Sequence, residues 1–167
     1  MMNDDSEDYF IARYTVGVCE TDDLINYANS KLSSGIYSDV LLDIIDASPR
    51  CWAVVSPIFE KLIVHIPSFE DSIKLIIKYH LKLIASEKFD PFIQFKQLLH
   101  DIENFDLHKN ITKYVGDNIG LERLYGLYYA RDNLDIYENG ITEIVSQMRE
   151  ESRKWLLEVY NECDNNS

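Results

Sequence analysis

Cysteine and long apolar runs are scarce in this sequence, and each scarcity excludes a class of protein. The three cysteines, Cys19, Cys51 and Cys163, are odd in number and share no short spacing, so we expect neither a disulfide framework nor a cysteine-bound metal. This pattern is typical of a reducing compartment, and we expect a cytoplasmic protein. No apolar run approaches the ~20 residues that cross a bilayer, and the acidic start MMNDDSEDYF does not resemble a signal peptide.

Motifs of catalysis are lacking as well. The patterns GxGxxG, GxSxG, HExxH and ExxH do not occur, nor does a phosphate-binding GxxxxGK loop. No histidine follows an arginine by five residues, as it does in the all-helical HEPN ribonucleases. We therefore expect no enzyme, no cofactor and no metal. A hydrolase that uses His100, His108 and the nearby carboxylates is kept as a separate hypothesis.

Positive charge is in short supply. The chain of 167 residues carries 29 acidic and 16 basic side chains, a net charge of −13. Such a balance repels nucleic acid and anionic membranes, and it favours a basic protein as the partner. The length suits one domain over residues 1–167, in which residues 1–5 and 164–167 are expected to fray.

The strongest pattern is the amphipathic stretch 68–88, which we expect to be a nearly fully buried central helix. Ser68 is the expected N-cap, and His80 lies in the apolar arc, where we expect a bond to a backbone carbonyl. Lys74, Lys78 and Lys82 form the only polar stripe. The residues of the inward arc are Phe69, Ile73, Ile76, Ile77, His80, Leu81 and Ile84.

Other helices are expected on both sides of this one. Thr21 and Ser38 are expected N-caps, and Ser56 and Pro57 predict a helix from Pro57 to His65. Asp90 and Pro91 repeat that start signal, whereas residues 106–120 are predicted to be a loop. The expected helical ranges are 6–17, 22–32, 39–47, 57–65, 68–88, 91–105, 120–134 and 141–162. This is an all-α chain of seven or eight helices with no sheet.

The helix over residues 39–47 has a clear division of faces. Leu41, Leu42, Ile44 and Ile45 are predicted to face inward, while three aspartates fall on one outer edge. An acidic group at the N-terminus is a second candidate face. Its members are Asp4, Asp5, Glu7, Asp8, Glu20, Asp22 and Asp23.

Acid and tyrosine gather between residues 101 and 138, where the only basic residues are Lys109, Lys113, Arg123 and Arg131. Tyrosine offers a large contact area at little entropic cost, and carboxylates at a rim attract a basic partner. The alternative is that the tyrosines line the core and the acids are a solvated edge. The predicted partner-binding residues are Asp101, Glu103, Asp106, Asp117, Glu122, Tyr125, Tyr129, Asp132, Asp135, Tyr137 and Glu138.

Residues 9–47, YFIARYTVGVCETDDLINYANSKLSSGIYSDVLLDIIDA, carry a "DLI.YA...L" helix followed by a "G..SD.LL.I" helix. This pattern resembles the opening of small helical bacterial immunity proteins of contact-dependent growth inhibition systems. The resemblance implies that the partner is the toxic C-terminal domain of a delivered effector, often a basic nuclease. It implies no catalytic residues.

Together these features predict an immunity protein that covers the active site of a cognate toxin domain with an acidic, tyrosine-rich surface. A non-catalytic helical adaptor or regulatory subunit is the alternative, and it would present an exposed apolar groove instead. The toxin class, the contacting face and the oligomeric state are left open by the sequence.

Overall fold

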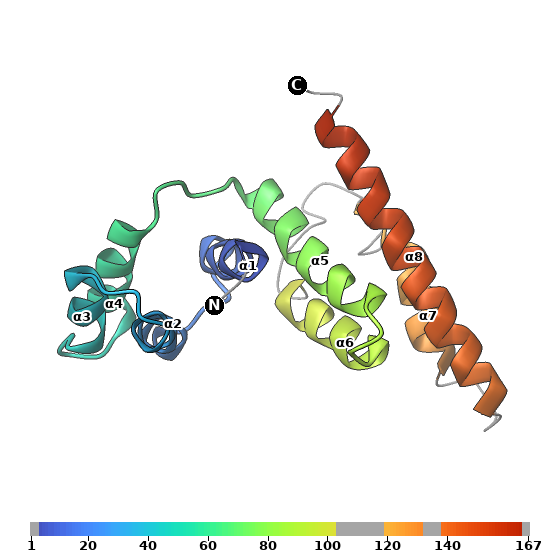
Figure 1. Ribbon diagram of the computed structural model, residues 1–167, viewed down its shortest axis with the longest axis horizontal. Coiled ribbons are helices and arrows are strands. Elements are labelled where there is room, and N and C mark those ends of the chain that lie inside the picture. The colour runs from blue at the N-terminus through green and yellow to red at the C-terminus, as the bar shows by residue number, and fades with distance from the viewer. Residues whose placement is uncertain (1–3, 103–118, 132–137, 165–167) are drawn as a thin grey trace. The chain divides into compact units, whose positions relative to one another are not determined.

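The protein is all-α, as the sequence predicts (Figure 1). A computed structural model describes residues 4–102, 119–131 and 138–164, and within these ranges it has eight α-helices, one 3₁₀ turn and no β-strand. In the part of the chain that is described, no helix is both long and apolar enough to cross a membrane.

The helices fall into two compact units, and the boundary lies inside α5 (Phe69–Ala85). The N-terminal unit is Met1–Ile73 and the C-terminal unit is Lys74–Ser167. The prediction of one domain stays a prediction. The other elements of the N-terminal unit are α1 (Asp4–Thr15), α2 (Thr21–Ser33), α3 (Asp39–Ile45), α4 (Trp52–Phe59) and the 3₁₀ turn η1 (Glu60–Leu62). The C-terminal unit holds the rest of α5 with α6 (Pro91–Ile102), α7 (Glu122–Ala130) and α8 (Glu138–Asp164).

Two glycines end the first two helices. Gly17 and Gly35 have φ of 80° and 88°, the left-handed conformation that closes a helix at its C-terminus. After Gly35, the Ile36 N–H donates to the Lys31 carbonyl at 3.0 Å, which bonds the turn back onto α2. Ser38 then caps α3, because its hydroxyl accepts the Leu41 N–H at 3.2 Å.

The start of α2 differs from the prediction by one residue. Glu20, not Thr21, is the N-cap, and its backbone N–H donates to Asp23 Oδ2 at 2.9 Å. The Asp23 carboxylate therefore lies in the first turn of α2, where the helix dipole favours negative charge.

The predicted helix Pro57–His65 is wrong. Helix α4 begins at Trp52 with Cys51 as its N-cap, and Pro57 lies inside it. Val55 and Phe59 lie four residues apart on one face, and both are buried. Burial of this face outweighs the one backbone hydrogen bond that Pro57 cannot donate, so Ser56 and Pro57 do not start a helix.

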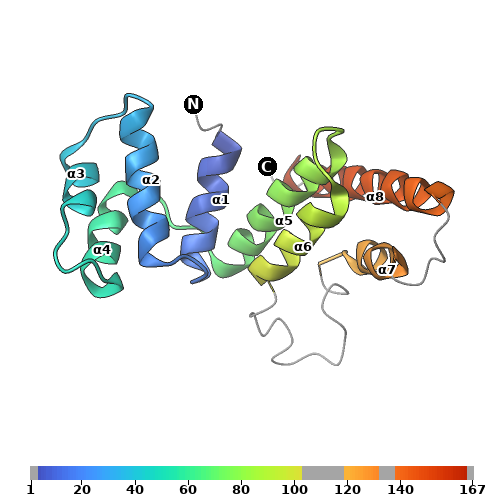
Figure 2. The same ribbon diagram turned by 90° about the horizontal axis from the view of Figure 1, so that it is seen from below.

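The core of the N-terminal unit is aromatic where α1, α2 and α4 meet. Phe59 contacts the rings of Phe10, Tyr14 and Tyr27 at centroid distances of 5.8, 4.9 and 5.4 Å. Helices α2, α3 and α4 all contact one another, and Figure 2 shows them side by side. Leu24, Ala28, Leu41 and Ile44 complete this core.

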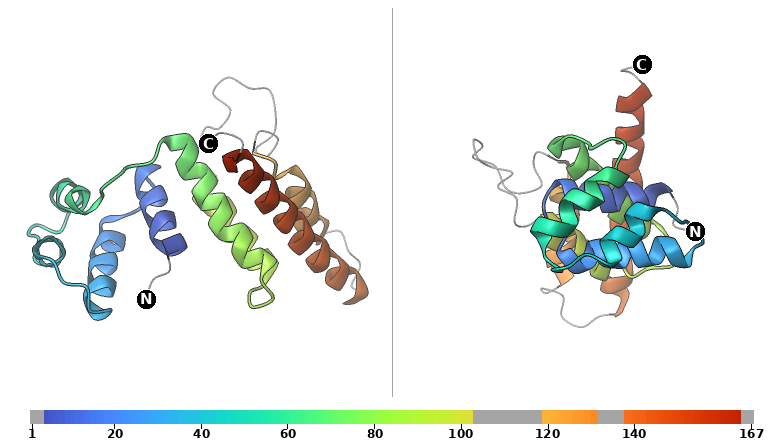
Figure 3. Two further views of the ribbon diagram at one scale, coloured as in Figure 1. Left: turned by 45° about the horizontal axis from the view of Figure 1, so that its top comes forward. Right: turned by 90° about the vertical axis from the view of Figure 1, so that its left-hand side faces the viewer.

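Helix α5 buries the predicted inward residues, with the exception of Phe69, which is half exposed. Its start is capped as predicted, since the Asp71 N–H donates to the Ser68 hydroxyl at 3.1 Å. In the C-terminal unit α8 lies beside α5, and Arg153 donates to the Ala85 carbonyl at 3.2 Å (Figure 3). Asp90 caps α6 by accepting the N–H groups of Phe92 and Ile93.

Candidate functional site

The candidate site lies on α7 and on the neighbouring part of α8. Three tyrosines of α7, Tyr125, Tyr128 and Tyr129, form what we call the α7 tyrosine face. Tyr128 and Tyr129 meet edge to face with centroids 5.2 Å apart, and Tyr125 is 6.4 Å from Tyr129. Tyr125 and Tyr128 also contact Phe95 of α6, at 5.4 and 5.3 Å. The face is therefore seated on a buried aromatic base.

The phenol groups of this face are only partly buried by the residues that the structure describes. Tyr129 is 54% exposed, and the Tyr125 and Tyr128 side chains are partly exposed. None of the three hydroxyls makes a hydrogen bond within the residues that the structure describes. Partial burial, assisted by the neighbouring Tyr129, raises the pKa of Tyr125 to about 12, so this phenol is neutral and able to donate at neutral pH.

A cation borders the same face. The Arg131 guanidinium lies 4.9 Å from the centroid of the Phe92 ring, within the range of a cation–π contact. Phe92 in turn lies 6.3 Å from Tyr128. The edge of the tyrosine face nearest the end of α7 thus carries one positive group.

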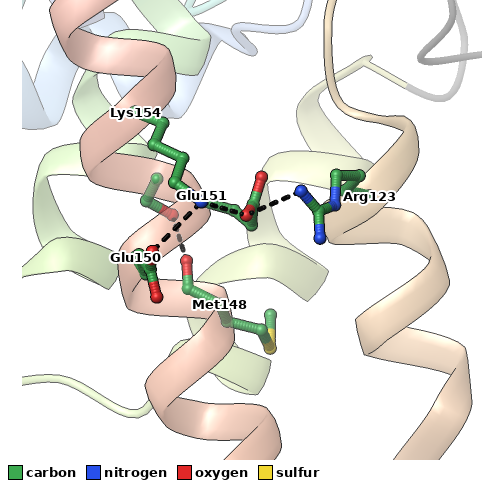
Figure 4. A network of polar contacts seen from close by, with 6 residues as sticks. Arg123, Met148, Glu150, Glu151 and Lys154 are labelled. Carbon is green, nitrogen blue, oxygen red and sulfur yellow. Dashed lines mark hydrogen bonds and ion pairs between the residues drawn. The ribbon is translucent and has the colours of Figure 1, made fainter.

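A chain of ion pairs joins α7 to α8 (Figure 4). Arg123 lies 3.2 Å from Glu151, and Glu151 lies 2.9 Å from Lys154. Lys154 also pairs with Glu150 at 3.1 Å. The hydrogen bonds that Lys154 donates to Glu151 and then to Glu150 raise its pKa, because they favour the charged form of this surface lysine. Both cations of the network are therefore already neutralised by carboxylates of α8.

A groove beside this network contains further carboxylates. It is lined by Glu122 of α7 and by Glu158 of α8, and Trp155 is also in its lining. Neither glutamate makes an ion pair within the described residues. The Trp155 indole N–H donates to the Ile119 carbonyl at 2.7 Å, which fixes the ring in position. The groove therefore offers two unpaired negative charges beside an anchored aromatic ring.

The structure places only part of the predicted site. Glu122, Tyr125 and Tyr129 are at the surface of α7, and Glu138 is the first residue of α8. The remaining predicted residues except Asp101 lie outside the described residues: Glu103, Asp106, Asp117, Asp132, Asp135 and Tyr137. Three of the predicted residues are thus brought onto one helix.

Asp101 does not belong to an exposed acidic surface. It is only 5% exposed, and its Oδ2 lies 3.1 Å from His80 Nε2 of α5. The sequence predicts a bond from His80 to a backbone carbonyl, and the contact that the structure describes is with the Asp101 carboxylate. A buried carboxylate needs a hydrogen-bonding partner, and the imidazole supplies one. Asp101 therefore joins α6 to α5 inside the C-terminal unit.

The other candidate groups are described only in part. His100 is exposed on α6 and His108 lies outside the described residues, so their pairing stays a prediction. Within the described residues no group of three or more His, Cys, Asp or Glu side chains is arranged to hold a metal ion. In the N-terminal acidic group, Glu7 accepts hydrogen bonds from Tyr27 and Lys31, which lowers its pKa.

Sequence reasoning missed the contribution of α8 to this surface. Glu150 and Glu151 precede Lys154 by four and three residues, a spacing that places their side chains together on a helix. That local signal is readable in the sequence. The pairing of Arg123 with Glu151 joins two helices across 28 positions and has no such signal.

Comparisons with known proteins identify no relative of this chain: no protein-family model matches it, and neither a curated protein nor a solved structure does so.

Proposed function

We propose that this chain is an immunity protein that binds and neutralises the toxin domain of a contact-dependent growth inhibition system, a basic nuclease acting on RNA or DNA. The observation that carries the proposal is the α7 tyrosine face, whose partly exposed phenols are without hydrogen bonds in the described residues. Such rigidly seated aromatic side chains are typical anchors of protein interfaces.

The chemistry of inhibition follows from charge. A nuclease binds phosphates in a basic groove, and a chain with a net charge of −13 is attracted to the same groove. Glu122 and Glu158 would meet lysine or arginine side chains there, because the cations beside them are already paired within the protein. The tyrosines would supply the desolvated centre of the contact. The toxin would then lose access to its substrate without any chemical step by its inhibitor.

The proposal is tested by titrating the purified full chain with the toxin domain encoded beside it, using calorimetry and a nuclease assay. We expect a 1:1 complex and loss of nuclease activity. Tyr125→Ala combined with Tyr129→Ala is expected to weaken binding by at least about 30-fold, equivalent to about 2 kcal/mol.

Leu157→Ala is the matched control, since Leu157 is an exposed apolar residue of α8 at 64% exposure and belongs to neither the tyrosine face nor the groove. It should leave the affinity unchanged. If the wild-type chain forms no complex and the toxin stays active, the proposed function is wrong. If the complex forms but ignores the tyrosine substitutions, the function stands and the binding face lies elsewhere.

A helical adaptor is the second candidate, and one feature favours it. Between η1 and α5, Val64 is fully exposed and Ile66 is about half exposed, and Phe69, the first residue of α5, is also half exposed. An adaptor that docks through these apolar side chains would bind with little dependence on salt. Toxin binding through carboxylates would weaken clearly as salt screens the charges, so the salt dependence separates the two functions.

A further inference from the structure

The outward side of α3 combines apolar and acidic residues in a way that folding does not require. Asp39, Leu42, Asp43 and Asp46 lie within one arc of this helix and its C-cap, and all four are exposed. We call this set the α3 outer face. The opposite side holds the buried Leu41 and packs against α2 and α4. Leu42 was expected to face inward, but it is 47% exposed.

Two more apolar side chains precede this face. Ile36 is 50% exposed and Tyr37 is 79% exposed. Their backbone is held on both sides, by the Ile36 N–H bond to the Lys31 carbonyl and by the Ser38 cap of α3. A fixed backbone presents these side chains with little entropy left to lose on binding, which is a property of interface anchors.

Charge decides which occupant fits this surface. The side-chain carboxylates of the three aspartates of the α3 outer face make no hydrogen bond or ion pair within the described residues. The N-terminal unit as a whole has 13 acidic and 4 basic side chains, a net charge of −9. A second copy of this chain docked face to face would place like charges together, which is unfavourable. A basic protein gains from the same charges.

We propose that the α3 outer face, together with Ile36 and Tyr37, is a docking surface for a basic protein. Tyr37 and Leu42 enter an apolar recess of that partner, and Asp39, Asp43 and Asp46 pair with lysine or arginine side chains around it. The assignment rests on the proposed function in one respect, since it takes the toxin domain as the basic partner. The α3 outer face then contributes to that complex separately from the α7 tyrosine face.

The test measures the affinity and association rate of the full chain for the purified toxin domain by surface plasmon resonance. Tyr37→Ala combined with Leu42→Ala is expected to raise Kd by at least about 30-fold, mainly through faster dissociation. Asp43→Asn combined with Asp46→Asn is expected to slow association several-fold and to flatten its dependence on salt. The matched control is Glu70→Gln with Glu87→Gln, which removes two exposed charges that belong to none of the candidate faces.

The possible outcomes are distinct. Circular dichroism of each variant checks that the helices are retained, and the aspartate pair supplies an independent measurement if the apolar pair does not fold. Loss of affinity in the α3 variants, with the control unchanged, supports the docking surface. A tight wild-type complex that the α3 variants leave unaltered overturns the docking surface and leaves the proposed function standing. Absence of any wild-type complex overturns both.

Discussion

Two groups of tyrosines, one in each unit, differ in where their hydroxyls go. In the N-terminal unit Tyr14 and Tyr27 lie inside, and their hydroxyls bond Ser56, Glu60 and Glu7. In the C-terminal unit the three tyrosines of α7 keep part of their surface exposed, and their hydroxyls have no partner in the described residues. A hydroxyl that is hydrogen-bonded inside its unit distinguishes a core tyrosine from a tyrosine at the surface, and the residue type alone does not.

The two units also differ in how deeply they bury a pair of polar side chains that contact each other. The N-terminal unit places the charged ends of Glu7 and Lys31 at the margin of its core, and Glu7 keeps 39% of its side chain exposed. The C-terminal unit instead buries both partners of the His80 and Asp101 contact, at 2% and 6% side-chain exposure. Removal of one partner should therefore cost more in the second case, because no water can replace it.

The largest effect is expected from Phe59→Ala, which removes the ring at the centre of the N-terminal aromatic core. The cavity should lower the free energy of unfolding by about 3–5 kcal/mol. The chain has two tryptophans, Trp52 and Trp155, one in each unit, so single-tryptophan variants report on the units separately in urea denaturation. Tyr129→Ala, at an exposed ring, is the control and should change stability by about 0.5 kcal/mol or less.

This experiment also sharpens the division into units. If Phe59→Ala shifts the Trp52 and Trp155 transitions together, the units unfold as one cooperative domain. If only the Trp52 transition moves, each unit folds by itself. A loss of less than about 1 kcal/mol in the Trp52 transition would contradict the central role given to Phe59.

A smaller effect is expected from Asp101→Ala in the C-terminal unit. The buried imidazole of His80 would lose its carboxylate, at an expected cost of about 1–3 kcal/mol in the free energy of unfolding reported by Trp155. Asp101→Asn keeps an oxygen that can accept a hydrogen bond, so its cost should be smaller. Glu122→Ala, an exposed carboxylate of α7, is the control. Equal stability of all three variants would show that the contact contributes nothing.

The smallest effect is expected from Glu7→Gln, and it depends on pH. Bonds from Lys31 and Tyr27 hold the pKa of Glu7 below its ordinary value of 4.5 in the folded state. The contribution of the Glu7 carboxylate to the free energy of unfolding is therefore present above pH 4.5, and it is lost as the pH falls through the lower, folded-state pKa. The carboxylate is partly exposed, so we expect only about 0.5–1 kcal/mol.

Urea denaturation at pH 7 and at pH 3 measures this contribution. Glu7→Gln should destabilise the N-terminal unit at pH 7 and should make its stability less sensitive to acid than that of the wild type. Asp8→Asn, at an exposed position next to Glu7 in sequence, is the control. If wild type and Glu7→Gln lose the same stability between pH 7 and pH 3, Glu7 does not contribute to the acid sensitivity of the unit.

Much of the fold is readable from the sequence because helix signals are local. The caps at Ser38, Ser68 and Asp90 are one-turn contacts, and the all-α class follows from helical periodicity. The start of α4 was not readable, since a buried face outweighed the signal of Ser56 and Pro57.

The candidate site is less readable for a physical reason. The sequence shows Asp101 only as an acidic residue of an acidic region. In the structure it is buried against His80, which lies 21 positions away in the chain. Leu42 counts as apolar, yet it points outward among aspartates. Such outcomes depend on tertiary packing, which helical periodicity does not encode.

Gly120 is exposed at the entry to α7, where tolerance of substitution would ordinarily be high. Its φ of 70° disfavours every residue with a side chain, and a Cβ there would lie 3.3 Å from Trp155 Cδ1. In a library that samples every amino acid at each solvent-facing position, position 120 should therefore accept glycine almost alone. Sequence diversity at this point of the chain is limited by the indole of α8 and by backbone geometry.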